Sequence, residues 1–398
     1  MKVLMIAPQP WFSPRGTPFS VLHRLRTLSK LGHHIDLVTY PIGENVPIKN
    51  VTINRTAKVP FFKKIVIGPS KRKLIFDWFL YRKATALLKQ HKYDLIHTHE
   101  EAGFFAPILA RKFNLLHLYD MHSSLPQQLT NFKYTQLRGL ISLFERFERY
   151  TITNAEAVIT ICPELYNYVK KLYPDKFNML IENVADNSQA FSENQIPVEN
   201  LRNEYQLNGQ LVVVYAGTFE HYQGIDLLIE SSQKVLAKHK NVKLCLVGGS
   251  PAQVEKYQAL VSAKNLSAHY IFTGSVKPEE VPNFVNLADI LVSPRIEGNN
   301  TPLKIYSYLR SGRPIVATRH ITHTQVLNDE VSVLTDVTPI AFAEGILSVI
   351  EDQALRTKIS QNAQRLAEEK YSYEVYVKKT REVYDYLESK LTTKGTQG

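Results

Sequence analysis

Short apolar runs alternate with helical patterns along the whole chain. The first run, at 3–7, is followed by a loop and then by Val21, Leu25 and Leu28, whose spacing is typical of one buried helical face. This alternation predicts α/β domains with parallel sheets. We expect further strands at 35–40, 51–56, 94–99, 115–120, 157–162 and 178–183, and then at 211–216, 244–247, 270–273, 290–293 and 314–318.

The length of the chain predicts two domains, because 398 residues exceed what one hydrophobic core usually supports. A polar stretch at 186–200, rich in Asn, Ser and Glu, is the candidate linker. We therefore expect an N-terminal domain at 1–186, a C-terminal domain at 187–370 and a final helical segment at 371–398.

Composition is that of an ordinary soluble globular protein, with 44% hydrophobic and 21% charged residues. Cys162 and Cys245 lie in separate apolar runs, which predicts two buried thiols rather than a disulfide or a metal site. No apolar run is long enough to span a membrane, and the first strand leaves no room for a cleavable signal, so we expect a cytoplasmic protein. A net charge of +11 points to an anionic partner.

The segment 58–92 concentrates positive charge, with ten Lys and Arg residues against one acid, Asp77, and with aromatic residues interleaved. Cations beside aromatic rings favour contact with an anionic membrane surface, here the inner face of the plasma membrane. A solvated helix with one buried face would show the same basic residues. No nucleic-acid recognition module is present, so we do not expect a nucleic acid as partner.

The stretch 293–312 carries the strongest ligand-binding signal. It follows an apolar run and reads SPRIEGNNTPLKIYSYLRSG. Thr301 suits a helix N-cap and Pro302 the first helical position, so the pattern predicts a helix start at the C-terminal edge of a sheet. Such an end favours phosphate, and Arg295 and Lys304 would add full charges. The alternative is an ordinary strand, loop and helix.

The loop 8–17 carries a related signal. Gly16 permits close approach of a ligand to the backbone, and Thr17-Pro18 repeats the pair that opens the later helix. A tight turn that requires Gly is the alternative.

Polar residues follow two other predicted strands, at 97–101 and 120–124. In open parallel sheets ligands bind at such C-terminal strand ends. We expect a hydrogen-bonding or proton-handling role for His99 or His122, with satisfied structural histidines as the alternative, and we expect no metal site. The chain contains neither a Gly-x-Ser-x-Gly elbow nor a Walker phosphate loop.

Taken together, the motifs resemble those of the retaining glycosyltransferases of family 4, also called glycosyl transferases group 1. The resemblance implies the GT-B fold: α/β, with two Rossmann-like domains facing across a cleft and a C-terminal helix that crosses back to the N-terminal domain. The motifs that carry it are PRGTP at 14–18, HTHE at 97–100, YDMHSS at 119–124, YAGT at 215–218, LVGG at 246–249, FTG at 272–274 and TPLKIY at 301–306.

The resemblance implies transfer of a sugar from a nucleotide-sugar, held mainly by the C-terminal domain, to a lipid-linked or polysaccharide acceptor, held mainly by the N-terminal one. Such a reaction serves cell-envelope, glycolipid or exopolysaccharide synthesis. The family needs no metal or cofactor, so amides and cations must stabilise the diphosphate leaving group.

The resemblance also implies roles for individual residues. The catalytic candidates are His99, Glu297 and Lys304. The acceptor-side candidates are Asp120, His122 and Ser123. The candidates for donor and phosphate binding are Gly16, Thr17, Arg15, Gly217, Thr218, Arg295, Gly298, Asn299, Asn300, Thr301 and Ser307.

Two departures from the family pattern stand out. The Arg and Lys that commonly contact the diphosphate are replaced by Thr218 and Gln223. The second acid of the usual Glu pair falls on Ser307 when counted back from Gly312, but on Ile305 when counted from the first acid. The alternatives are therefore a degenerate, non-catalytic protein that binds a sugar nucleotide or a partner, and a nucleotide-sugar epimerase of related fold.

Overall fold

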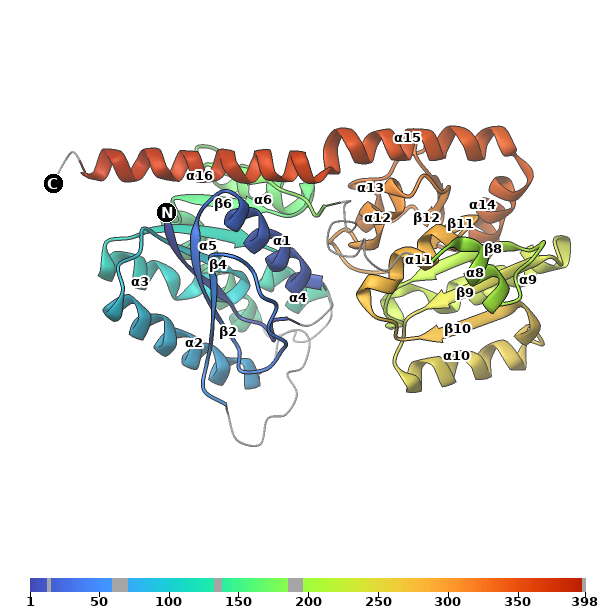
Figure 1. The fold of residues 1–398 in the computed structure, drawn as a ribbon, viewed down its shortest axis with the longest axis horizontal. Helices are drawn as coiled ribbons and strands as arrows, with labels where there is room; N and C mark the ends of the chain where they lie inside the picture. Colours follow the sequence, from blue (N-terminus) through green and yellow to red (C-terminus); the bar gives the residue numbers. More distant parts are fainter. Residues whose placement is uncertain (13–15, 59–70, 132–137, 185–195, 396–398) are drawn as a thin grey trace. The chain divides into compact units, whose positions relative to one another are not determined.

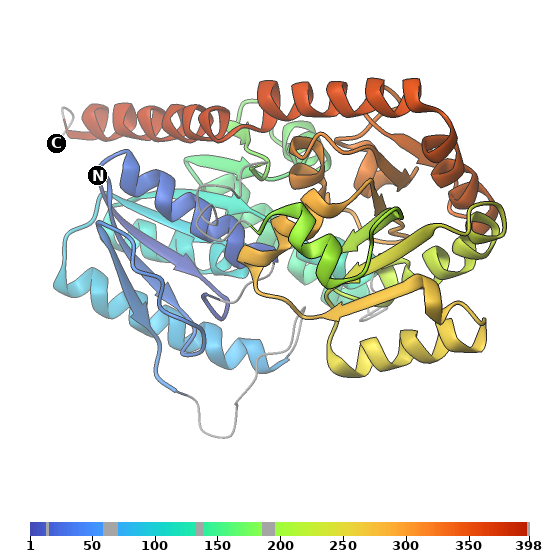
Figure 2. The ribbon, with the colours of Figure 1, turned by 45° about the vertical axis from the view of Figure 1, so that its right-hand side comes forward.

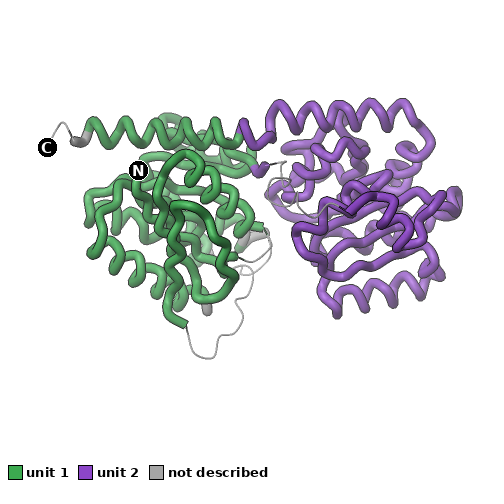
Figure 3. The backbone as a smooth tube through the Cα atoms, viewed as in Figure 1, with its two compact units in different colours: residues 1–182, 376–398 green, residues 183–375 purple. Residues whose placement is uncertain are grey.

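The computed structural model describes residues 1–12, 16–58, 71–131, 138–184 and 196–395 (Figure 1). The chain forms two compact units, the first built from 1–182 and 376–398 and the second from 183–375 (Figure 3). Arg15, Lys63, Lys64 and most of the expected linker lie outside the described residues. The prediction of two buried free thiols, Cys162 and Cys245, is confirmed.

The first unit contains a seven-stranded parallel sheet in the order β3-β2-β1-β4-β5-β6-β7. Its central strands are buried almost throughout, as expected where helices cover both faces of a parallel sheet. The strands are β1 (Lys2–Ala7), β2 (His34–Thr39), β3 (Val51–Arg55), β4 (Leu95–His99), β5 (Leu116–Met121), β6 (Ala157–Thr160) and β7 (Asn178–Leu180).

Helices cover both faces of this sheet. The helices are α1 (Gly16–Lys30), α2 (Lys71–Gln90), α3 (Ala106–Phe113), α4 (Leu125–Asn131), α5 (Arg138–Asn154), α6 (Pro163–Leu172) and α16 (Tyr373–Gly395), with a 3₁₀ turn, η1, at Glu100–Phe104. Figures 1 and 2 both show α2 in light blue on one side of the sheet and α16 in red on the other.

The side-chain contacts assign the helices to the two faces. Ile96 packs in one apolar cluster with residues of α2 and α3, and Tyr119 packs in another with residues of α5 and α6. The register of β4 and β5 places Ile96 and Tyr119 on the same face. Alternate residues point the other way, so His97 meets Tyr384 of α16 and Asp120 meets Arg24 of α1.

The final helix, α16, packs on the first unit, which confirms the predicted return of this helix to the N-terminal domain. The ring of Tyr386 stacks on Phe177, with 4.0 Å between the ring centroids. Val383, Tyr384 and Leu387 are fully buried. The helix therefore completes one face of the sheet in the first unit.

The second unit contains a six-stranded parallel sheet in the order β10-β9-β8-β11-β12-β13. The two parallel sheets confirm the predicted fold class. The strands are β8 (Leu211–Ala216), β9 (Val242–Val247), β10 (Tyr270–Gly274), β11 (Ile290–Ser293), β12 (Ile315–Thr318) and β13 (Val333–Thr335). The sequence pattern missed β13, which has only three residues.

The helices of the second unit enclose two apolar clusters, one on each face of its sheet. They are α8 (Val198–Glu204), η3 (His221–Gln223), α9 (Ile225–Lys238), α10 (Pro251–Ala263), η4 (Ser267–His269), η5 (Pro278–Glu280), α11 (Val281–Leu287), α12 (Lys304–Arg310), α13 (Ile321–Thr324), α14 (Pro339–Glu351) and α15 (Gln353–Tyr371).

In each sheet the strand order reverses between two neighbouring strands. These are β1 and β4 in the first unit and β8 and β11 in the second. Ligands of open α/β sheets bind at this point, beyond the carboxyl ends of the strands. Candidate site residues such as Gly16, Gly217 and Arg295 follow β1, β8 and β11, whereas Asp120, His122 and Ser123 lie at the end of β5 or just after it.

The predicted start of the helix after β11 is wrong. Thr301 does not cap it, because α12 begins at Lys304 and the side-chain oxygen of Thr301 is buried without a hydrogen-bond partner among the described residues. Pro302 instead opens a tighter turn, in which the N–H of Ile305 donates to its carbonyl at 3.0 Å. The preference of Thr and Pro for a helix start is a local one, and the packing of the loop between β11 and α12 outweighs it here.

Candidate active site

Lys304, at the start of α12, lies among residues of the loop after β8. Its ammonium nitrogen is 3.7 Å from the centre of the Tyr215 ring and 3.5 Å from the side-chain oxygen of Gln223. A Cβ atom added to Gly217 would lie 3.4 Å from the same nitrogen, and the φ of +152° at this glycine is one that other residues rarely adopt. The lysine thus reaches the exposed backbone that follows β8.

Arg295, in the loop after β11, is the second cation of this cluster. Its Nε donates to the carbonyl of Glu297 at 2.7 Å, and its guanidinium lies 5.1 Å from the centre of the Tyr222 ring. A Cβ atom on Gly298 would come within 2.4 Å of the guanidinium. Only glycine fits at position 298 while Arg295 keeps this orientation.

The charges of these two cations are not balanced by a carboxylate within the described part of the chain. Neither Lys304 nor Arg295 forms an ion pair with a carboxylate among the described residues. Burial lowers the pKa of Lys304 well below its usual value, and the charge of Arg295 lowers it further. Burial also lowers the pKa of Arg295. A bound anion would relieve both effects, because it supplies the missing negative charge.

The remaining donor-side candidates surround this cluster. Thr218 and Glu297 are exposed, while Gly298, Asn299 and Asn300 are half-buried. The two possible positions of the second acid differ in environment. Ile305 is fully buried in an apolar cluster, whereas Ser307 is half-buried and donates to the carbonyl of Lys304 at 3.0 Å. Ser307 is therefore the one that a ligand could reach.

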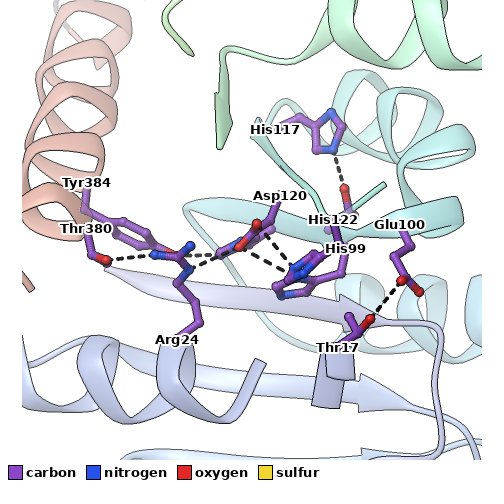
Figure 4. A network of polar contacts seen from close by, with 11 residues as sticks. Thr17, Arg24, His99, Glu100, His117, Asp120, His122, Thr380 and Tyr384 are labelled. Carbon is purple, nitrogen blue, oxygen red and sulfur yellow. Dashed lines mark hydrogen bonds and ion pairs between the residues drawn. The ribbon is translucent and has the colours of Figure 1, made fainter. Parts of the chain in front are cut away.

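In the first unit, Asp120 at the end of β5 is the centre of a buried polar network (Figure 4). One carboxylate oxygen is 3.1 Å from Nε of Arg24 and 3.4 Å from Nε2 of His97. The other is 3.3 Å from Nε2 of His122. His99 joins through a hydrogen bond of 2.9 Å between its Nδ1 and Nε2 of His122. The network therefore brings together three predicted residues, Asp120, His99 and His122.

Helix α16 contacts this network through Arg24 and His97. Arg24 donates to the hydroxyl of Thr380 at 2.7 Å, and its guanidinium lies 4.9 Å from the centre of the Tyr376 ring. The hydroxyl of Tyr384 is 2.9 Å from Nδ1 of His97. Sequence reasoning missed these contacts, although Arg24 gave a signal: it lies on the same helical face as Val21, Leu25 and Leu28, and a charge on a buried face requires a partner.

Burial and the Arg24 charge together set the protonation of the network. Burial opposes ionisation of Asp120, but Arg24, with a smaller effect from His122, holds the pKa of this carboxyl well below its usual value. Burial lowers the pKa of His99, His97 and His122, which Asp120 only partly offsets. The network is thus an ion pair surrounded by neutral imidazoles at neutral pH.

The network also offers metal-ligating atoms. His97, His99 and Asp120 each present one atom, all within 4.8 Å of one another, a spacing that a metal ion could bridge. Arg24 already pairs with a carboxylate oxygen of Asp120, and its positive charge would repel a metal cation at this site. The sequence prediction of no metal site stays a prediction.

Glu100, directly after His99, links the network to α1. Its carboxylate accepts a hydrogen bond of 3.1 Å from the hydroxyl of Thr17. Burial, and then the charge of Glu101, raise the pKa of Glu100 to about 7. Gly16 is exposed beside Thr17, and Ser123 is half-buried next to His122. Glu100 was not among the predicted site residues, although it follows a motif histidine at a strand end.

The described helices include none that is both long enough and apolar enough to cross a membrane.

Two family models match the chain. The model for glycosyl transferases group 1 matches residues 197–366, and the model for glycosyltransferase family 4 matches residues 14–180. Together they cover most of both units.

Two curated relatives align along nearly the whole chain. The phosphatidylinositol N-acetylglucosaminyltransferase GPI3 subunit of Saccharomyces cerevisiae is 23% identical over 384 residues, 94% of this chain and 80% of that protein. The phosphatidyl-myo-inositol mannosyltransferase of Mycobacterium tuberculosis is 22% identical over 400 residues, 97% of each chain.

Solved structures share the fold. The sucrose-phosphate synthase of Thermosynechococcus elongatus superposes with a TM-score of 0.78 at 20% identity, over 98% of this chain and 99% of that one. Anabaena HepE in complex with UDP superposes with a TM-score of 0.72 at 15% identity, over 98% of this chain and all of that one. The motifs, the two parallel sheets, the family models and these relatives agree, and the chain belongs to the group 1 glycosyl transferases of family 4, with the GT-B fold.

Proposed function

We propose that the protein transfers a sugar, with retention of configuration and without a metal, from a nucleoside-diphosphate sugar to a lipid-linked or glycan acceptor. The observation that carries the proposal is a pair of half-buried cations without a carboxylate partner among the described residues. Lys304 lies beside the backbone of Gly217, and Arg295 lies in the loop after β11. A diphosphate is the ligand whose charge and size suit such a pair.

The proposed reaction exchanges one bond at the anomeric carbon. The bond to the diphosphate oxygen breaks and a bond to the acceptor oxygen forms, while the acceptor hydroxyl gives its proton to an oxygen of the departing diphosphate. Negative charge therefore develops on the diphosphate as its bond to the sugar breaks. Lys304 and Arg295 stabilise this charge as it develops. We propose that the sugar and the nucleoside contact Glu297, Asn299, Asn300 and Ser307.

The acceptor and the transferred sugar are proposed to meet the network of the first unit. His99 sits at the end of β4, and its Nε2 has no hydrogen-bond partner among the described residues. Asp120 and His122 hold its ring from the Nδ1 side. We propose that acceptor hydroxyls bind Ser123, which follows β5, and the hydrogen-bonded pair of Thr17 in α1 and Glu100 in η1.

A lipid-linked acceptor is supported by two observations. Both curated relatives named above have phosphatidylinositol-type lipids in their names. The described part of the basic segment 58–92 exposes Leu74, Ile75 and Trp78, and Arg82 lies over the Trp78 ring at 4.9 Å. We propose that this segment contacts an anionic membrane surface from the cytoplasmic side, close to a glycolipid acceptor.

Thermal unfolding with UDP, GDP, ADP, CMP or dTDP, with and without magnesium, tests the proposal. A ligand at a hundred times its dissociation constant stabilises a protein by about 2.7 kcal/mol. We expect the nucleotides of one base to raise the unfolding midpoint regardless of magnesium. The Lys304→Ala variant should lose this shift, and the control variant Lys256→Ala, at an exposed position, should keep it.

No shift with any nucleotide would contradict the proposal and favour a non-catalytic protein. With the donor base known, the anomeric configuration of the product, read by NMR, tests retention. An epimerised donor formed without acceptor would instead indicate an epimerase.

A further inference from the structure

The helices that cover one face of the sheet in the first unit carry an unusual surface. We call α2, α3, α5 and α6 the outer helical layer. All nine exposed large apolar side chains among the described residues of this unit lie on it. They are Leu74, Ile75 and Trp78 on α2, Ile108 on α3, Leu140, Leu143, Phe147 and Tyr150 on α5, and Leu172 on α6.

The exposed charges of the outer helical layer are all positive. Among its described side chains, no carboxylate is exposed: Asp77 is bonded to Tyr40, Glu148 is buried, and Glu145 and Glu164 are half-buried. The exposed charged residues are Arg82, Lys89, Arg111, Lys112, Arg146, Arg149, Lys170 and Lys171.

The opposite side of the unit lacks both features. The part of α16 in this unit exposes the acids Glu382, Asp385 and Glu388 together with the bases Lys378, Arg381 and Lys390, and no large apolar side chain among its described residues. The exposed apolar residues and the lack of exposed acids therefore distinguish the outer helical layer from α16, although α16 is as long as any helix of the outer layer.

The apolar stripe on α5 is the clearest part of this surface. Leu140, Leu143, Phe147 and Tyr150 recur every three or four residues, the spacing that places them along one side of a helix. The other side of α5 meets the unit, where Ile152 packs in the apolar cluster of Tyr119 and Glu148 is buried. The stripe faces outward although it has the spacing of a core-facing helix.

We infer that the outer helical layer, with the α5 stripe at its centre, docks on an anionic lipid bilayer. Apolar side chains enter the acyl boundary while Lys and Arg bind acidic headgroups. A second copy of the chain is disfavoured, since two faces with only positive exposed charges repel. A nucleic acid would satisfy the charges but leave the apolar stripe in water.

The exposed apolar surface begins at the starts of α2, α3 and α5 and continues along α5 to Tyr150, and its beginning indicates the orientation. Helices that follow parallel strands start at the C-terminal edge of the sheet, as the ion pair of Lys73 with Glu101 after β4 illustrates at 2.8 Å. Leu74, Ile75, Leu140 and Leu143 lie within the first six residues of α2 and α5. The bilayer would therefore meet the edge that carries His99 and Glu100, where a lipid acceptor is needed.

This inference extends the membrane contact of the proposed function from 58–92 to four helices, and its test needs no turnover. The full-length protein is sedimented with vesicles of phosphatidylcholine alone or with 30% phosphatidylglycerol, at low and high salt, roughly 0.05 M and 0.5 M. We expect binding that requires phosphatidylglycerol and weakens with salt.

Two double variants of α5 probe the stripe and its charges. Leu143→Ser with Phe147→Ser, and Arg146→Glu with Arg149→Glu, should each weaken vesicle binding by about tenfold or more. The matched controls on the second unit are Ile321→Ser with Ile340→Ser, which are more exposed, and Lys358→Glu with Arg365→Glu on α15. These should bind as the wild type does.

Unchanged unfolding midpoints and unchanged nucleotide-induced shifts would show that the variants fold and that any loss concerns the membrane alone. Wild-type vesicle binding by both α5 variants would overturn the inference, as would no binding to phosphatidylglycerol vesicles. A dimer that the serine variant dissociates would assign the stripe to a second copy. Binding of duplex DNA that depends on the arginines but not on Leu143 and Phe147, without vesicle binding, would assign the layer to nucleic acid.

Discussion

The ammonium nitrogen of Lys304 lies 3.5 Å from the side-chain oxygen of Gln223, although 81 residues separate the two along the chain. Position 223 is where the family resemblance leads one to expect the diphosphate-binding lysine. We propose that Lys304 of α12 supplies the charge that is missing from this loop, since its ammonium group lies next to the Gln223 side chain.

A charge exchange between these positions tests that interpretation. Lys304→Gln should weaken nucleotide binding by about tenfold to a hundredfold, because a charge-assisted hydrogen bond contributes about 1.5–3 kcal/mol. The double variant Gln223→Lys with Lys304→Gln should regain part of the affinity. Calorimetric titration with the nucleotide found in the thermal screen measures both. Unchanged affinity in Lys304→Gln would contradict the assignment.

A substitution at Gly298 tests whether nucleotide binding depends on the orientation of Arg295. In Gly298→Ala the new methyl group would lie 2.4 Å from the guanidinium, so Arg295 must move and nucleotide affinity should fall about tenfold. Gly209→Ala is the matched control, because that glycine also has a positive φ but open space around it. Both variants should lose about 1 kcal/mol of stability through backbone strain, and only the first should lose affinity.

The buried ion pair of Arg24 and Asp120 should dominate the stability of the first unit. Arg24→Met leaves Asp120 buried without its cation, and removing one partner of such a pair costs about 3–5 kcal/mol. Asp120→Asn in the same chain should recover part of this loss. Urea unfolding of the single and double variants gives the coupling, with the exposed Lys30→Met as control. Additive losses would show that the two side chains do not act as a pair.

Glu148 predicts a pH dependence of stability. Burial raises its pKa from 4.5 to about 7 although Tyr168 and Ser124 donate to it. Between these values the folded chain keeps a proton that the unfolded chain has released, so the free energy of unfolding falls as pH rises from about 4.5 through about 7. Asp77 and Glu100, also raised to about 7, act in the same direction.

Glu148→Gln should remove up to about 3 kcal/mol of this decline, since one pKa unit corresponds to about 1.4 kcal/mol. The amide oxygen can still accept from Tyr168 and Ser124, and the readout is the slope of stability against pH rather than its value at one pH. Urea unfolding between about pH 4.5 and 8 measures the slope. An identical slope in wild type and variant would refute the assignment.

Much of the fold followed from the sequence because it rests on short-range regularities. A strand such as β8 is an apolar run between the polar Gln210 and Gly217, and a parallel sheet buries it on both faces. The helix start at Lys304 did not follow, because Thr301 and Pro302 satisfy the local rules for a cap and tertiary packing of the loop overrode them. The strand β13 was not predicted, because three residues are too few to show a periodic pattern.

The sequence by itself determined the fold class, the family and the strand ends that hold His99, Asp120 and Arg295, since each depends on residues close together in the chain. Only the tertiary structure decided which distant residues act together. It brought Lys304 to Gln223, Arg24 to Asp120, and α16 behind the histidines. It also turned the α5 stripe outward, because helical periodicity identifies an apolar face but not whether that face meets a core or the surroundings.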